Sequence, residues 1–215
     1  MASYHHISFF PILLSFSLIV STFNIAIAAS SSSSASSSPS TSAKTLNTYT
    51  TFIKDYCNST TYPKNCYKFL SPYASVIKTS PLILTRASIY LALKQTSRSS
   101  YDLRSLSLFK NLTHNETVVI KDCLENVYSS LDRVKQSAVS VKSLKGGNSS
   151  DDEAFEWSNI KTWMSAAITG YTTCTDEFAE KKLSDSYQKM ISSRVMKAHD
   201  LASNALSVVN KFTNY

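Results

Sequence analysis

Apolar residues recur at helical spacing through most of this chain, and the pattern is clearest near its middle. There, apolar positions alternate at steps of three and four over about 22 residues, which is typical of a helix with one buried face. We expect all of these positions in the core: Ile120, Leu124, Val127, Leu131, Val134, Ala138 and Val141. Gly146 and Gly147 follow this segment and mark the end of the helix.

Three more long helices are predicted around this one. Ser80 and Pro81 form an N-cap and a first-turn proline, and they begin a helix through Leu93 that bends or restarts within 96–100 and continues to about Leu112. The next helix begins near Asp151, in an acidic run that suits the positive end of a helix dipole, and its apolar stripe is Ile160, Trp163, Ala167, Gly170, Cys174 and Phe178. The last begins after Ser184, with the stripe Tyr187, Ile191, Val195, Ala198, Leu201, Ala205, Val208 and Phe212.

Four long amphipathic helices with short connections predict an up-down-up-down bundle, here spanning about 80–213. Two shorter segments, 45–56 and 67–77, predict a helical hairpin over about 45–77. The whole chain contains only three glycines, which disfavours both a β-rich fold and a phosphate-binding loop, because tight turns and close backbone approaches use glycine. The expected fold class is therefore all-α.

The first part of the chain has the composition of a targeting segment. Residues 9–20 are almost continuously apolar, and Ala26-Ile27-Ala28 has the small residues of a cleavage site, so we predict a secretory signal peptide over 1–28. Residues 29–43 are mostly serine and predict a disordered leader. No later apolar run approaches the roughly 20 residues that span a bilayer. We therefore expect a secreted protein whose folded domain covers 44–215.

The cysteines predict two disulfides. Four cysteines in a secreted chain are typical of disulfide pairing, and three pairings are possible. We favour Cys57–Cys66, which closes a short loop containing Tyr62-Pro63, and this leaves Cys123–Cys174 to join two long helices that antiparallel packing brings together. Asn-x-Ser/Thr sequons mark candidate glycosylation sites at Asn58, Asn111, Asn115 and Asn148.

The polar residues form no recognisable reactive site. The usual hydrolase, metalloprotease and nucleotide-binding motifs do not occur. His114 and His199 do not complete a zinc-binding spacing, and we do not interpret His199-Asp200 as an acid–base pair, because adjacent helical residues point in different directions. We expect no catalytic residue, metal or cofactor. The net charge of +7 suits a solvated surface or attraction to an acidic extracellular partner, while nucleic acid is not expected without a basic cluster.

Several segments together resemble a known family. These segments are 122–128 (DCLENVY), 163–169 (WMSAAIT), 173–178 (TCTDEF) and 203–206 (SNAL), in addition to the short loop between Cys57 and Cys66. From about Lys44 to the end, the chain resembles the plant invertase and pectin methylesterase inhibitor family. The resemblance implies a helical hairpin before a four-helix bundle, with one disulfide in the hairpin and one between the second and third bundle helices. It also implies a cell-wall (apoplast) protein that binds a wall enzyme in a 1:1 complex.

The motifs at 163–167 and 173–174 look more like the pectin methylesterase branch of this family. The Pro-Lys-Phe tripeptide associated with invertase inhibition is absent, because Pro63-Lys64 is followed by Asn65. The expected partner is therefore pectin methylesterase. Acid invertase is the alternative target, and a non-inhibitory wall protein that binds pectin through its +7 charge is the alternative function. Because the chain stops at Tyr215, we expect a stand-alone inhibitor and not the pro-region of an esterase.

In such inhibitors the bundle helices are expected to cover the pectin-binding cleft of the enzyme. Acids and hydroxyls off the apolar stripes could imitate the sugars and carboxylates that the cleft recognises, although the same pattern suits a merely solvated surface. The candidate binding residues are Asp122, Glu125, Ser129, Asp132 and Gln136 on the second long helix, and Thr162, Ser165, Thr169, Thr172 and Asp176 on the third.

Overall fold

The computed structural model describes residues 39–146, 150–181 and 183–213, all within the compact unit Ser37–Tyr215. The predicted signal peptide, most of the predicted leader and Asn148 lie outside the described residues. The elements in chain order are α1 (Pro39–Cys57), α2 (Pro63–Leu70), a 3₁₀ turn (Ser71–Tyr73), α3 (Ala74–Ile77), α4 (Pro81–Ser107), α5 (His114–Ser143), α6 (Asp151–Lys181) and α7 (Asp185–Thr213). The described part of the chain contains no strand, and the all-α prediction is confirmed.

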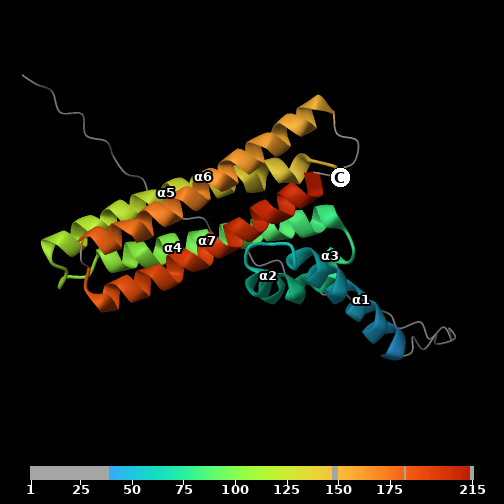
Figure 1. The fold of residues 1–215 in the computed structure, drawn as a ribbon, viewed down its shortest axis with the longest axis horizontal. Helices are drawn as coiled ribbons and strands as arrows, with labels where there is room; N and C mark the ends of the chain where they lie inside the picture. The colour runs from blue at the N-terminus through green and yellow to red at the C-terminus, as the bar shows by residue number, and fades with distance from the viewer. Residues whose placement is uncertain (1–38, 147–149, 182, 214–215) are drawn as a thin grey trace, which may run out of the picture. The chain divides into compact units, whose positions relative to one another are not determined.

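Helices α4 to α7 form the predicted up-down-up-down bundle (Figure 1). Helix α5 packs against α4 and α6, while α7 packs against α6 and α4. The order around the bundle is therefore α4–α5–α6–α7, and the pair α5/α6 lies opposite the pair α4/α7. Helices α1 to α3 pack against the α4/α7 pair, as Figure 1 shows for α2.

The ends of α4 and α5 are fixed by local hydrogen bonds. The Ser80 hydroxyl accepts from the Ile83 amide at 3.3 Å, as the predicted N-cap requires. At the start of α5, Thr113 and Glu116 form a capping box in which each side chain accepts from the other's amide. The Thr113 amide, together with hydroxyls of Ser184 and Thr113, holds the pKa of the Glu116 carboxyl below its ordinary value.

Helix α4 is continuous through 96–100, where the sequence predicted a bend or a restart. Three of its polar side chains there, Thr96, Ser99 and Ser100, are buried and hydrogen-bonded. The Thr96 hydroxyl bonds to the Ala92 carbonyl and to the Tyr171 hydroxyl, and the Ser99 hydroxyl donates to the Arg194 carbonyl of α7. Buried hydroxyls with partners do not break a helix. The helix ends at Ser107, before the predicted end at Leu112.

The C-terminus of α5 is capped from another helix. The Arg86 guanidinium of α4 donates to the carbonyls of Val141 at 3.1 Å and Lys142 at 3.2 Å, and it also reaches the Leu144 carbonyl. Terminal carbonyls have no partner within their own helix, and a cation is favourable at that end. Arg86 therefore ties α4 to the end of α5.

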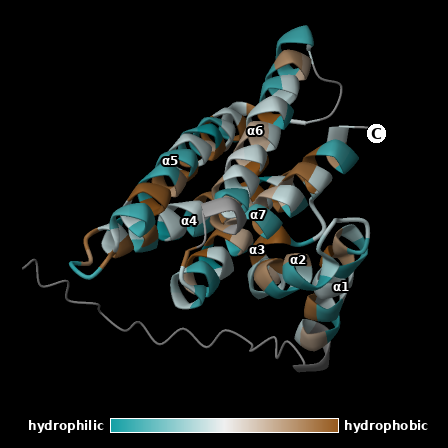
Figure 2. Cartoon of the chain, turned by 60° about the vertical axis from the view of Figure 1, so that its left-hand side comes forward, coloured by the Kyte–Doolittle hydropathy of each residue, from teal (hydrophilic) through white to brown (hydrophobic). Residues whose placement is uncertain are grey.

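The core of the bundle contains most residues of the predicted apolar stripes, but on α5 and α6 some neighbouring residues are buried in their place. Figure 2 shows hydrophobic and hydrophilic positions alternating along the long helices. On α5, Leu124 and Leu131 are only half-buried, whereas three small residues face the interior, namely Cys123, Ser130 and Ser137. On α6, Met164 and Tyr171 are fully buried in place of the predicted Trp163 and Gly170, which are half-buried. Small residues occupy the side of α5 that faces α6, so the two helices approach closely.

This shift gives a stability prediction. Ile120 is completely buried in α5, so Ile120→Ala is expected to lower the free energy of unfolding by about 2–5 kcal/mol through loss of contacts and a cavity. Leu131 lies half-buried, and Leu131→Ala should cost clearly less, about 1 kcal/mol. Urea denaturation of both variants measures the difference. Equal losses would contradict the assignment of Leu131 to the edge of the core.

The hairpin differs from its prediction at both arms. Helix α1 begins at Pro39 rather than Thr45, so 39–43 of the predicted disordered leader are helical; proline suits the first turn of a helix. Helix α2 begins at Pro63 for the same reason, and the second arm is divided by the 3₁₀ turn that contains Pro72. The hairpin has its own apolar cluster, built from Ile53, Leu70 and Ile77 and joined by Leu84, Leu91 and Val208 of the bundle.

Candidate functional site

All four cysteines form the two predicted disulfides. Cys57–Cys66 joins the end of α1 to α2, and Cys123–Cys174 joins α5 to α6. The four side chains are almost completely buried. Each disulfide therefore lies inside one of the two apolar clusters and fixes the pair of helices around it.

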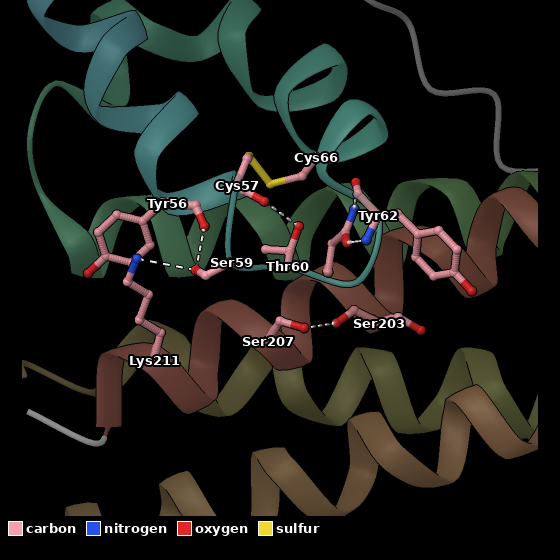
Figure 3. The surroundings of a disulfide bond; sticks show 10 residues. Tyr56, Cys57, Ser59, Thr60, Tyr62, Cys66, Ser203, Ser207 and Lys211 are labelled. Atoms are coloured by element: carbon pink, nitrogen blue, oxygen red, sulfur yellow. Dashed lines mark hydrogen bonds between the residues drawn. A yellow bond between two sulfur atoms is a disulfide. The ribbon is translucent and has the colours of Figure 1, made fainter.

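The loop closed by Cys57–Cys66 docks on α7 (Figure 3). The Asn204 side chain accepts from the Tyr62 amide at 2.9 Å and donates to the Tyr62 carbonyl at 3.0 Å. The Lys211 ammonium donates to the Ser59 hydroxyl at 3.2 Å and lies 4.4 Å from the centre of the Tyr56 ring. These contacts hold the hairpin against the bundle.

The helices α5 and α6 run antiparallel, and two contacts set their register. Cys123 is bonded to Cys174, and the Ser130 hydroxyl donates to the Ala167 carbonyl at 3.0 Å. A Cβ added at Gly170 would collide with the Ser130 hydroxyl and lie 3.0 Å from the Asn126 carbonyl oxygen. A side chain at Gly170 would therefore force the two helices apart.

Most of the predicted binding residues gather on the outer surface of this helix pair. We call this surface the α5/α6 face, and it consists of Asp122, Glu125, Ser129, Asp132, Gln136, Thr162 and Thr169. All are exposed except Asp122, which is half-buried.

Three predicted residues of α6, Ser165, Thr172 and Asp176, are turned away from α5. Each stands two positions after a residue that faces α5, namely Trp163, Gly170 and Cys174, and two helical steps rotate a side chain by about 200°. Thr172 is also half-buried, and its hydroxyl donates to the Thr169 carbonyl at 2.8 Å. The hydrophobic pattern of α6 alone, without the position of α5, does not separate these three residues from Thr162 and Thr169.

A groove of about 580 Å³ opens between α5 and α6 at the Asp132 end of the face. Its wall includes the half-buried Trp163, and the Glu156 carboxylate accepts from the Ser140 hydroxyl at 2.6 Å. Sequence reasoning placed Trp163 in the core and missed the groove; the spacing of seven between Glu156 and Trp163, which puts them on one side of α6, was the available signal. The lining residues are Asp132, Lys135, Gln136, Val139, Ser140, Ser143, Glu156 and Trp163.

Acidic residues are concentrated on α5 and α6. The two helices carry eleven of the 15 acidic residues and only six Lys or Arg, a formal charge of −5 in a chain whose total is +7. The acids are Glu116, Asp122, Glu125 and Asp132 on α5, and Asp151, Asp152, Glu153, Glu156, Asp176, Glu177 and Glu180 on α6. The helix pair α5/α6 is therefore the acidic side of the bundle, and its exposed carboxylates suit a partner with positive charge.

The adjacent residues His199 and Asp200 contribute to packing between α7 and the hairpin. His199 and Asp200 do contact each other, with 3.4 Å between Nδ1 and Oδ1, so the interpretation that they point apart was wrong. His199 is nearly buried and packs edge-on against Tyr62 at 5.8 Å, and Asp200 accepts from the Asn65 amide at 2.7 Å. Both residues therefore belong to the docking of the hairpin.

The buried hydroxyl of Tyr171 also has a structural role. Burial raises the pKa of the Tyr171 hydroxyl far above its ordinary value, with the Thr96 hydrogen bond opposing the shift, so this group stays neutral.

Among the described residues, no cluster of His, Cys, Asp and Glu could hold a metal ion. No described helix has the length and apolar character of a membrane span. The sequon residues Asn58, Asn111 and Asn115 are all exposed.

Comparison with known proteins decides the family. The family "Plant invertase/pectin methylesterase inhibitor" matches residues 51–208, which is most of the chain. The chain belongs to the plant invertase/pectin methylesterase inhibitor family. The resemblance inferred from the motifs and the cysteine framework is confirmed.

Relatives within this family cover most of both chains. The "21 kDa protein" of Daucus carota is 38% identical over 161 residues, covering 75% of this chain and 83% of the carrot protein. Pectinesterase inhibitor 11 of Arabidopsis thaliana is 32% identical, covering 75% of this chain and 80% of that inhibitor. A crystal structure of a mutant pectin methylesterase inhibitor from Arabidopsis matches with a TM-score of 0.59 at 16% identity, covering 74% of this chain and 96% of that chain. At that identity the structural match shows the inhibitor-family fold.

Proposed function

We propose that this protein inhibits plant pectin methylesterase by binding over the substrate cleft in a 1:1 complex. The observation that carries the proposal is membership of the inhibitor family over 51–208, together with relatives that are named pectinesterase inhibitors at 30% identity or above. The family is one of inhibitors and not of enzymes.

The α5/α6 face is the proposed contact surface. It presents carboxylates and hydroxyls on two helices that the Cys123–Cys174 disulfide and the approach at Gly170 hold rigidly together. A rigid face loses little side-chain and backbone freedom on binding, so more of the interaction energy appears as affinity. The cleft of an enzyme that acts on a uronic acid polymer suits such a surface, because carboxylates and hydroxyls are the groups that the polymer itself offers.

The groove beside Trp163 extends this surface. It places an indole ring, a carboxylate held by Ser140 and the exposed Val139 next to Asp132. Aromatic side chains in pockets with a polar rim are typical anchors of protein–protein contacts. In the proposed complex, a side chain of the enzyme enters this groove.

Pectin methylesterase is the favoured target over acid invertase. The segment 163–167 and the Thr173-Cys174 pair look more like the pectin methylesterase branch, and Pro63-Lys64-Asn65 differs from the Pro-Lys-Phe tripeptide. The predicted signal peptide supports a location outside the cell, in the wall where such an enzyme acts. The disulfides suit that compartment, because they persist in oxidising surroundings.

Titration of the purified protein into the two candidate enzymes tests this proposal. Methanol release from esterified pectin should fall to near zero at about one inhibitor per enzyme, as expected for tight binding. Sucrose hydrolysis by acid invertase should be unchanged at the same ratio. Inhibition of invertase alone would move the protein to the other branch of the family, and inhibition of neither enzyme would reject the proposal.

A further inference from the structure

Exposed basic residues gather on the side of the bundle opposite the α5/α6 face. Outside α5 and α6, the chain carries 16 Lys or Arg residues and four acidic residues. Seven Lys or Arg residues of α2, α4 and α7 are exposed, and we call five of them the basic face: Lys64, Lys68, Lys94, Arg98 and Lys197.

One ion pair places the α4 and α7 members of this face near each other. Asp102 of α4 forms an ion pair with Arg194 of α7. Lys94, Arg98 and Asp102 are spaced by four along α4, so they share one side of that helix. Lys197 follows Arg194 by three and shares its side of α7. The three cations therefore border the junction of α4 and α7.

The hairpin continues the face. The Asn65 amide of α2 donates to the Asp200 carboxylate of α7 at 2.7 Å, and Asp200 follows Lys197 by three. Lys64 precedes Asn65 and Lys68 follows it by three, so both lysines lie near this contact. Figure 1 shows α2 lying beside α4 and α7.

The acids near this face are already engaged. Asp102 is paired with Arg194, and Asp200 accepts from Asn65 and contacts His199. The electrostatic potential of the basic face is therefore set by its exposed cations and is positive. Tyr101, which is 71% exposed, follows Arg98 by three and adds an aromatic ring beside the cations.

We propose that the basic face binds a carboxylate-bearing uronic acid polymer, the de-esterified form of pectin. Hydrolysis of a methyl ester by water releases methanol and a proton and leaves a carboxylate, so the polymer gains negative charge wherever a methylesterase has acted. A row of exposed cations favours that product over the neutral esterified polymer. The Tyr101 ring can lie against a sugar ring while the cations pair with carboxylates.

The two faces are on opposite sides of the bundle, so one molecule can hold the polymer and the enzyme together. Binding of the enzyme by the α5/α6 face rests on the proposed function, whereas binding of the polymer by the basic face does not. The inhibitor would then collect on the regions of the wall where the esterase is active.

The experiment measures direct binding of the purified full protein to polygalacturonate, without any enzyme, at physiological salt. The variant Lys94→Gln/Arg98→Gln/Lys197→Gln should bind roughly ten- to hundred-fold more weakly than the wild type. The reason is that each exposed cation near a polyanion adds a similar share of the binding affinity, and the variant lacks three of them. The matched control Lys44→Gln/Lys54→Gln/Lys110→Gln removes the same charge from exposed positions elsewhere and should stay within about two-fold. Wild-type binding should also weaken steeply between low and high salt.

Three results would overturn the proposal. Equal weakening in both triple variants would mean that only net charge matters. Equal wild-type affinity for highly methylesterified pectin, or for dextran sulfate and anionic lipid vesicles, would mean that the face does not select a uronate polymer. Concentration-dependent self-association that the Lys94/Arg98/Lys197 variant abolishes would assign the face to the acidic surface of a second copy. The esterase assay on the same variant should remain at wild-type potency, so failure of polymer binding and failure of inhibition are read separately.

Discussion

Reversing the charge of Glu125 and Asp132 is expected to weaken inhibition of pectin methylesterase by roughly a hundred-fold, since like charges brought together at an interface cost several kcal/mol. Both residues are exposed on the α5/α6 face. The free energy of unfolding of Glu125→Lys/Asp132→Lys should change by no more than about 0.5 kcal/mol per site, because neither side chain contributes to the core. Inhibition constants and denaturation midpoints of the same preparations provide the comparison.

A matched control separates the position of the charge from its amount. Asp55→Lys/Asp185→Lys makes the same change at two exposed acids, one on α1 and one at the start of α7. This variant should keep nearly full potency. If Glu125→Lys/Asp132→Lys also keeps full potency at unchanged stability, the α5/α6 face is an ordinary solvated surface, and the enzyme contact has to be sought on α7 or the hairpin.

Removing the disulfide between α5 and α6 should have the largest effect on stability. Cys123 and Cys174 are 51 residues apart, and in the chain-entropy model a link of that length stabilises the fold by roughly 4 kcal/mol. Both side chains are fully buried in the bundle core, so Cys123→Ala/Cys174→Ala also loses packing there. Guanidinium denaturation under non-reducing conditions measures the loss.

The hairpin disulfide supplies the control for this prediction. Cys57 and Cys66 are nine residues apart, and the same model assigns their link roughly 2.5–3 kcal/mol. Cys57→Ala/Cys66→Ala should therefore be less destabilised than the bundle variant. The reverse order of the two losses would show that the hairpin cluster, and not the joining of α5 to α6, dominates the stability of the fold.

The amino-acid sequence by itself determined the all-α class, the four long helices, the hairpin, both disulfides and the family. The physical reason is that these features depend on local or paired information. Helical periodicity is a property of neighbouring residues, a cap such as Ser80-Pro81 acts within one turn, and four cysteines allow few pairings. The exposed position of most candidate binding residues followed from the same periodicity.

Only the tertiary structure decided which side of each helix faces which neighbour. The stripe on α5 named Leu131 as core, yet Ser130 is buried instead, because α6 approaches at Gly170, where a small residue is needed. The same register turns Thr172 away from α5 and opens the groove beside Trp163.

The separation of charge also arises from packing. The sequence shows a net charge of +7, but the order of the helices around the bundle places the acidic pair α5/α6 opposite the basic side of α2, α4 and α7. Contacts between distant segments, such as Arg86 with the end of α5 and Asn204 with Tyr62, likewise depend on that order. The hydrophobic periodicity of a helix defines which of its faces are apolar and which are polar. Which neighbouring helix each face contacts depends on how all the helices pack around a single core.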